Sequence, residues 1–142
     1  MPHLAWSLLA QSQAVDRETN AQSIFNIIEE VTIPADVKDP PSGEALSLGP
    51  SFACLQLWMR DQPEKAETAS ARVAVIGPNS QRLGEISFSV DLSDHPRTRA
   101  VLNLPFFPYM GPGTYSFVTE IQTGTDAWSP VSACPIVVKK AQ

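Results

Sequence analysis

The chain has 142 residues, which suits one domain, and its 43% hydrophobic and 18% charged residues are typical of a folded protein. Acidic residues outnumber basic ones fifteen to ten, and this net charge of -5 argues against nonspecific binding to nucleic acid or anionic membrane. No uncharged apolar stretch approaches the roughly 20 residues that span a bilayer. We therefore expect residues 1–142 to form one domain.

The start of the chain predicts a strand and not a secretory signal. No Lys or Arg precedes Arg17, and Ser7 interrupts a short apolar stretch. Leu4–Gln11 is therefore the first expected strand, and the protein is expected to be cytoplasmic. In that compartment Cys54 and Cys134 are expected to be reduced, buried thiols without a disulfide between them. The sequence does not indicate whether the two lie close in space.

The next segment, Thr19–Ile33, allows two interpretations. Apolar residues recur at helical spacing, at Ile24, Ile27, Ile28 and Val31. Alternating apolar positions between Phe25 and Ile33, together with many β-branched residues, favour a strand, which is our expectation. Residues 35–49 show no periodicity and are predicted to be a long loop.

Alternating apolar and polar residues predict the remaining strands. In the third run, Leu55, Leu57 and Met59 are expected to face the core, which leaves Trp58 and Arg60 on the outer face. Further strands follow at the alternating or apolar runs 73–75, 85–92, 100–104, 115–121 and 131–138. The expected core residues of these strands share the two-residue period: Ile86, Phe88, Val90, Leu102, Tyr115, Phe117 and Ile121. The last run is almost wholly apolar and is expected to be buried on both faces.

Short apolar runs separated by 13 Pro and 7 Gly predict an all-β sandwich or barrel of about seven or eight strands. Two stretches carry a family resemblance: Ser23 to Glu29 after the polar turn, and Leu104 to Phe117 with its Pro112-Gly113-Thr114-Tyr115 element. Together with a final apolar strand they resemble small, uncharacterised bacterial proteins built as immunoglobulin-like β-sandwiches. The resemblance implies a single antiparallel immunoglobulin-like sandwich and no catalytic residues.

The polar residues do not form a recognisable reactive site. His95 lies beside Asp94 in a predicted turn, where a solvated turn is the expected role. Carboxylates occur in loop pairs without a calcium-binding run, and Gly111-Pro112-Gly113 opens a strand and not a phosphate-binding helix. We therefore predict a non-enzymatic protein with no catalytic, cofactor-binding or metal-binding residues.

The sequence predicts a binding or assembly module. Its partner would be another protein, or a second copy forming a homodimer through an edge strand or an apolar sheet face, with no nucleic acid or membrane partner. The candidate partner-binding residues are Trp58 and Arg60 on the apparent outer strand face, and Tyr109 and Met110 in a proline-rich loop. Arg97 and Arg99 share one strand face and are interpreted as solvated edge charges.

The alternative function is binding of a small ligand or carbohydrate by an exposed tryptophan, either Trp58 or Trp128.

Overall fold

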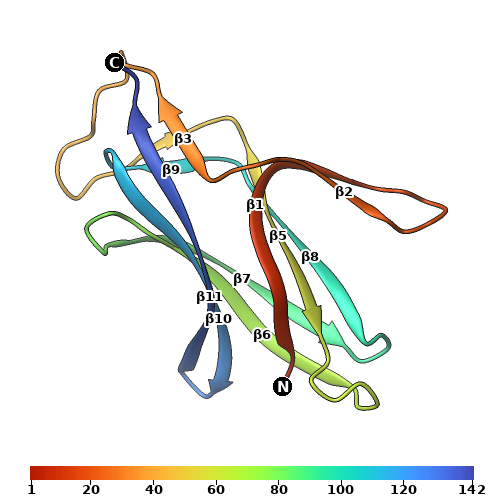
Figure 1. The fold of residues 1–142 in the computed structure, drawn as a ribbon. Coiled ribbons are helices and arrows are strands. Elements are labelled where there is room, and N and C mark those ends of the chain that lie inside the picture. The colour runs from red at the N-terminus through yellow and green to blue at the C-terminus, as the bar shows by residue number, and fades with distance from the viewer.

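The computed structural model describes all 142 residues, and every regular element in it is a β-strand (Figure 1). There are eleven strands: β1 His3–Val15, β2 Gln22–Ile27, β3 Glu30–Ile33, β4 Leu46–Leu48, β5 Phe52–Met59, β6 Glu67–Ile76, β7 Arg82–Leu92, β8 Arg97–Leu104, β9 Phe107–Tyr109, β10 Gly113–Gly124 and β11 Ala127–Lys140. The all-β expectation is thereby confirmed. The strand count exceeds the seven or eight expected, because the segment at 19–33 forms two strands and the short strands β4 and β9 lie outside the predicted runs.

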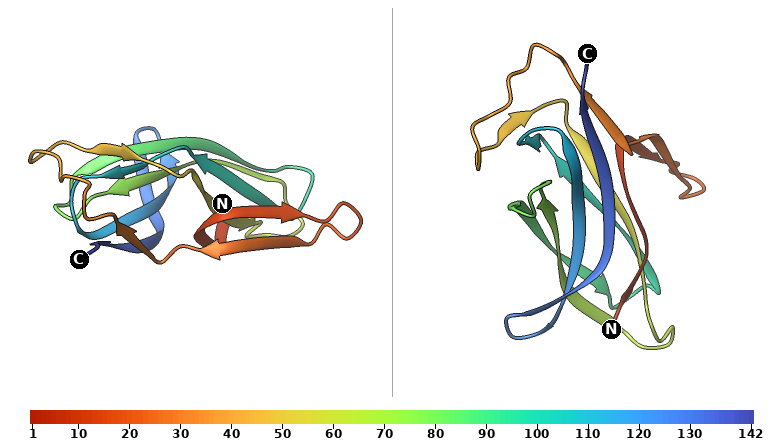
Figure 2. Two further views of the ribbon diagram at one scale, coloured as in Figure 1. Left: turned by 90° about the horizontal axis from the view of Figure 1, so that it is seen from above. Right: turned by 60° about the vertical axis from the view of Figure 1, so that its left-hand side comes forward.

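Two large sheets form a sandwich-like arrangement, which the views of Figure 2 show from two sides. The first sheet has the order β2-β1-β5-β8, the second has the order β3-β11-β10-β6-β7, and β4 pairs with β9 in a small third sheet. The main core lies between the large sheets. It joins Leu9 and Phe52 of the first sheet to Val73 and Phe117 of the second. Burial of these side chains is the main force that holds the layers together.

Every strand expected from the alternating pattern is present, and the ambiguous segment is extended. Residues 22–27 and 30–33 form β2 and β3, and no helix forms there. Asn26, with a φ of 55°, lies near the end of β2, and Ile28 and Glu29 separate the two strands. β3 is stabilised by parallel pairing with β11, a partner more than 100 positions away that local periodicity does not reveal. The loop predicted at 35–49 contains the short strand β4, which pairs with β9.

The predicted core face is correct, although its burial is uneven. Val90, Tyr115, Phe117 and Ile121 are buried, whereas Ile86, Phe88 and Leu102 are partly buried against the same clusters. The last run is not buried on both faces, which corrects that expectation. Ile136 and Val138 face the core, but Val131 and Val137 remain 43% and 39% exposed because nothing covers the outer face of β11.

The predicted orientation of β5 is wrong. Trp58 is fully buried between the sheets, while Leu55, also fully buried, belongs to a separate cluster with Ala10 and Ala53. Ile24 of β2 packs against that cluster, so the outer face of β5 is covered as well. With both faces covered, alternation along β5 cannot identify the inner face.

A buried hydrogen-bond network explains why a glutamine occupies the core side of β5. The Gln56 side chain is fully buried, and its Nε2 donates to Thr119 Oγ1 of β10 at 2.8 Å. Its Oε1 accepts from Trp58 Nε1, also at 2.8 Å. These bonds satisfy the buried amide and join the two sheets.

Tyr115 fixes the turn that leads into β10, and we expect Tyr115→Phe to be destabilising. Its hydroxyl donates to the Gly111 carbonyl at 2.6 Å and accepts from the Met110 backbone N–H at 2.7 Å. Phenylalanine would keep the ring and leave both buried backbone groups without a partner, at a cost of about 1–3 kcal/mol. Urea unfolding of the two proteins measures the difference. A change below about 0.5 kcal/mol would show that this turn does not depend on the hydroxyl.

Candidate functional site

The β1–β2 hairpin folds over the outer face of the first sheet. The first part of β1 pairs with β5 as far as Ala10, and the rest pairs only with β2. In Figure 1 the hairpin leaves the end of the sheet and projects to one side. Ile24 anchors its underside on the Leu55 cluster, and Asn20 at its tip accepts a 2.7 Å hydrogen bond from Arg99 Nη2 of β8. The hairpin therefore reaches from β1 to the opposite edge of its own sheet.

A groove of about 810 Å³ lies between the hairpin and the sheet. We call it the hairpin groove, and its lining residues come from the hairpin, the sheet and the β7–β8 turn: Trp6, Thr19, Asn20, Gln22, Ile24, Leu57, His95, Pro96, Arg97, Thr98 and Arg99. Trp6, Ile24 and Leu57 form its apolar part, and each is only partly buried. Arg97 and Arg99 line the groove from β8, where the register places them beside Met59 and Leu57 on the outer face.

The two groove arginines have no acidic partner within the chain. Arg97 is exposed and is absent from every ion pair of the structure, and Arg99 contacts only the backbone oxygen and side-chain amide of Asn20. In a chain of net charge -5, two guanidinium groups without counter-charges give the groove a local positive character. Planar guanidinium groups bind carboxylates through paired hydrogen bonds.

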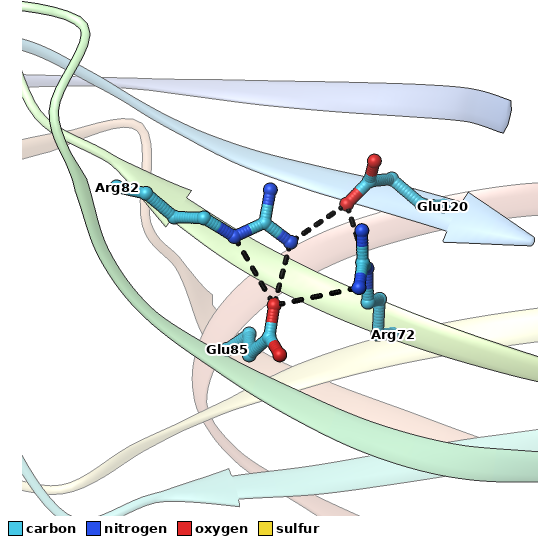
Figure 3. A network of polar contacts seen from close by, with 4 residues as sticks. All are labelled: Arg72, Arg82, Glu85 and Glu120. Carbon is cyan, nitrogen blue, oxygen red and sulfur yellow. Dashed lines mark hydrogen bonds and ion pairs between the residues drawn. The ribbon is translucent and has the colours of Figure 1, made fainter. Parts of the chain in front are cut away.

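The outer face of the second sheet shows the opposite arrangement, in which arginines are neutralised (Figure 3). Arg72 Nε lies 3.0 Å from Glu120 Oε1, and Arg82 Nη2 lies 2.6 Å from Glu85 and 2.9 Å from Glu120. The Arg72 guanidinium also stacks 4.1 Å from the centre of the Trp128 ring. Trp128 is thus engaged within the chain, and this network offers no free charge to a ligand.

Acidification is expected to weaken this network. Burial raises the pKa of Glu120, but hydrogen bonds and charge attraction from Arg72 and Arg82 outweigh it, and the net pKa is lowered. A lowered carboxyl pKa contributes stability above the unfolded-state value of about 4.3, and that stability is lost as pH falls through the folded-state value. Glu120→Gln should therefore be less stable than the parent at neutral pH and lose less stability on acidification. Urea unfolding across a pH series tests this, and parallel stability curves for the two proteins would contradict it.

The four residues predicted to bind a partner do not form one exposed surface. Trp58 and Tyr109 are fully buried, so their expected exposure is wrong. Tyr109 donates a 2.6 Å hydrogen bond to Asp39, and Met110 packs against the main core. Arg60 donates to the carbonyls of Leu92, Pro63 and Ser93 and thereby holds neighbouring turns together.

Sequence reasoning missed the groove although its parts were visible. Arg97 and Arg99 stood out at strand spacing, and Trp6 lay in the first predicted strand. The contact between Asn20 and Arg99, 79 positions apart, and the packing of Ile24 on the Leu55 cluster bring the hairpin over them. No local pattern predicts a contact at that separation.

A second cavity borders β8 from the core side. It has a volume of about 270 Å³, lies between β7 and β8, and includes Trp58, Phe88, Ala100 and Leu102 in its lining. We call it the β7–β8 seam. It shares Thr98 and Arg99 with the hairpin groove, so β8 separates the two cavities. Because β7 and β8 are each the last strand of their sheet, neither edge is paired at the seam.

The two cysteines are free, and neither lies in the hairpin groove. Burial raises the pKa of the Cys54 thiol to about 11, against the opposing effect of its contact with Ser7. At neutral pH Cys54 is therefore protonated, and the thiolate is the nucleophilic form. Cys134 donates to the Ser7 carbonyl at 3.3 Å. Through these contacts both thiols take part in the packing of the sheets.

Comparison with known protein families and with curated proteins gives no match. The structure contains no cluster of three or more His, Cys, Asp or Glu side chains that could hold a metal ion. It also contains no helix long and apolar enough to cross a membrane.

Proposed function

We propose that this protein is a non-enzymatic binding module with an immunoglobulin-like topology, and that it binds a protein partner at the hairpin groove. The strand order supports the topology. β1, β5 and β8 face β11, β10 and β6, as strands A, B and E face G, F and C in immunoglobulin-like sandwiches. The hydrogen bonds of Tyr115 to the preceding turn resemble the tyrosine corner of that fold.

The unneutralised pair of arginines carries the functional proposal. Arg72, Arg82, Lys139 and Lys140 have carboxylate partners, and the other Lys and Arg side chains do not. Among the cations without a carboxylate partner, Arg97 and Arg99 are the two that line the hairpin groove. They lie beside an apolar floor that includes Trp6 and Leu57. Aromatic residues and arginine are enriched at the energetic centres of protein interfaces.

Selection from a displayed peptide library tests the proposal, with the double variant Arg97→Gln, Arg99→Gln as the counter-target. Peptides enriched on the parent protein are expected to bind the double variant with an affinity at least about tenfold lower. Lys38→Gln, which removes an exposed cation of the β3–β4 loop that has no ion pair, is the matched control and should bind as the parent does. Binders that are indifferent to the arginine substitutions and to Trp6→Ala would contradict the groove as the binding site.

A carbohydrate is the second candidate ligand, because Trp6 is partly buried in the groove close to the amide side chains of Asn20 and Gln22. Trp6 therefore replaces Trp58 and Trp128 as the tryptophan that would bind a sugar. Calorimetric titration with neutral and acidic oligosaccharides tests it. Saturable binding that Trp6→Ala abolishes would favour a sugar over a peptide.

A further inference from the structure

The free edge of β8 lies between a cationic groove on one face and, on the other, a cavity lined mostly by apolar residues together with Ser89 and Asp91. We propose that an extended segment of a protein partner adds to this edge as a new strand, with acidic side chains on the groove side and apolar side chains on the seam side. This inference rests on the proposed function, because it names the chemistry of the partner at the same site. Strand addition to an exposed sheet edge is a common mode of peptide recognition.

The spacing of the charges favours an extended acidic ligand. Arg97 and Arg99 are two positions apart on the outer face of β8, so their backbone positions are about 7 Å apart. An extended peptide places alternate side chains at the same interval and on the same face. Acidic residues at positions i and i+2 of an added strand would therefore lie opposite Arg97 and Arg99 as cross-strand ion pairs.

The β7–β8 seam determines which side chains suit the inward face of the added strand. Thr98, Ala100 and Leu102 point inward from β8, since their partners in β5 are Trp58, Gln56 and Cys54. The neighbouring cavity of about 270 Å³ is lined by Phe88 and Val90 across the seam. Apolar side chains of an added strand would fill this space and complete the burial of Phe88 and Leu102, which the protein leaves only partly buried.

The other strand at the seam is less suited to an acidic segment. The outward residues of β7 are Glu85, Ser87, Ser89 and Asp91, as its register with β6 shows. Glu85 is ion-paired with Arg82, so Asp91 is the carboxylate on that face without a cationic partner. Asp91 would repel an acidic strand, whereas the two arginines of β8 attract it. The charge distribution therefore selects the edge of β8 over that of β7.

A synthetic peptide of alternating Glu and Val, with neutral Gly ends, is the direct probe. We expect it to bind the parent protein and to slow the hydrogen exchange of β8 amides that are unpaired in the free protein. The same peptide N-methylated at alternate residues should lose most of its affinity, because it cannot form the strand ladder. A peptide of the same composition with its Glu residues grouped together should also bind with an affinity at least about tenfold lower. Such a peptide cannot place acidic side chains on the groove side and apolar side chains on the seam side at once.

Variants connect binding to the outer face of β8. Arg97→Gln with Arg99→Gln should weaken the alternating peptide about fivefold or more, and Lys38→Gln should not. Undiminished binding of the N-methylated peptide, protection of β7 amides instead of β8 amides, or absence of binding at millimolar peptide would each overturn the proposal. Concentration-dependent self-association that protects β8 would also overturn it, since the occupant would then be a second copy. If library peptides without the alternating pattern still require Arg97 and Arg99, the binding function stands and only this inference fails.

Discussion

Replacing Trp58 by alanine is expected to lower the free energy of unfolding by about 3–5 kcal/mol, the range for truncating a large buried aromatic side chain. The indole is fully buried, meets Phe88 edge-on with ring centres 6.3 Å apart, and donates to Gln56. Truncation removes this packing and leaves the Gln56 oxygen without its donor. Urea unfolding followed by circular dichroism measures the loss without relying on tryptophan fluorescence. A loss below about 1 kcal/mol would mean that Trp58 does not face the core.

Trp58→Phe separates packing from hydrogen bonding at the same position. Phenylalanine keeps an aromatic ring in the core but cannot donate to Gln56 Oε1. We expect it to cost less than the alanine variant and still more than about 1 kcal/mol, because a buried acceptor loses its partner. Equal losses for the two variants would assign the whole effect to the lost hydrogen bond and none of it to packing.

Leu55→Ala is expected to destabilise the protein by about 2–5 kcal/mol, although Leu55 lies on the side of β5 opposite Trp58. Its side chain is fully buried in the cluster of Ala10 and Ala53 on which Ile24 of the hairpin packs. Truncation creates a cavity beneath the hairpin. Urea unfolding gives the size of the loss, with Val101→Ala as the control on the same outer face, where the side chain is 37% exposed. Equal, small losses for Leu55→Ala and Val101→Ala would mean that the hairpin does not cover β5.

Alternation of residue types predicted the strands well where one face of the strand meets water. β7 and β10 follow this rule, because Ser87 and Ser89 alternate with Phe88 and Val90, and Ser116 lies between the buried Tyr115 and Phe117. The orientation of β5 was not predictable in this way. Leu55 and Trp58 are both fully buried, on opposite faces, and Gln56 is inside because Thr119 and Trp58 satisfy its amide.

The site depended on information that local sequence patterns do not contain. The pair Arg97 and Arg99 was visible as two charges on one strand face, but exposed edge charges are common in soluble proteins. Their significance comes from what surrounds them: a hairpin tip at Asn20, the Trp6 side chain from the first strand, and the absence of any carboxylate partner. Each of these is a long-range relation between strands.

The position of the hairpin is the central structural claim, because it covers β5 and forms one wall of the groove. Nuclear Overhauser effects between the methyl groups of Ile24 and those of Leu55, measured on methyl-labelled protein, test it most directly. Ile24 packs on the Leu55 cluster in the structure, so strong cross-peaks are expected. Absence of these cross-peaks, with Ile24 methyl shifts at unfolded-chain values, would contradict the folded-over hairpin and the groove it encloses.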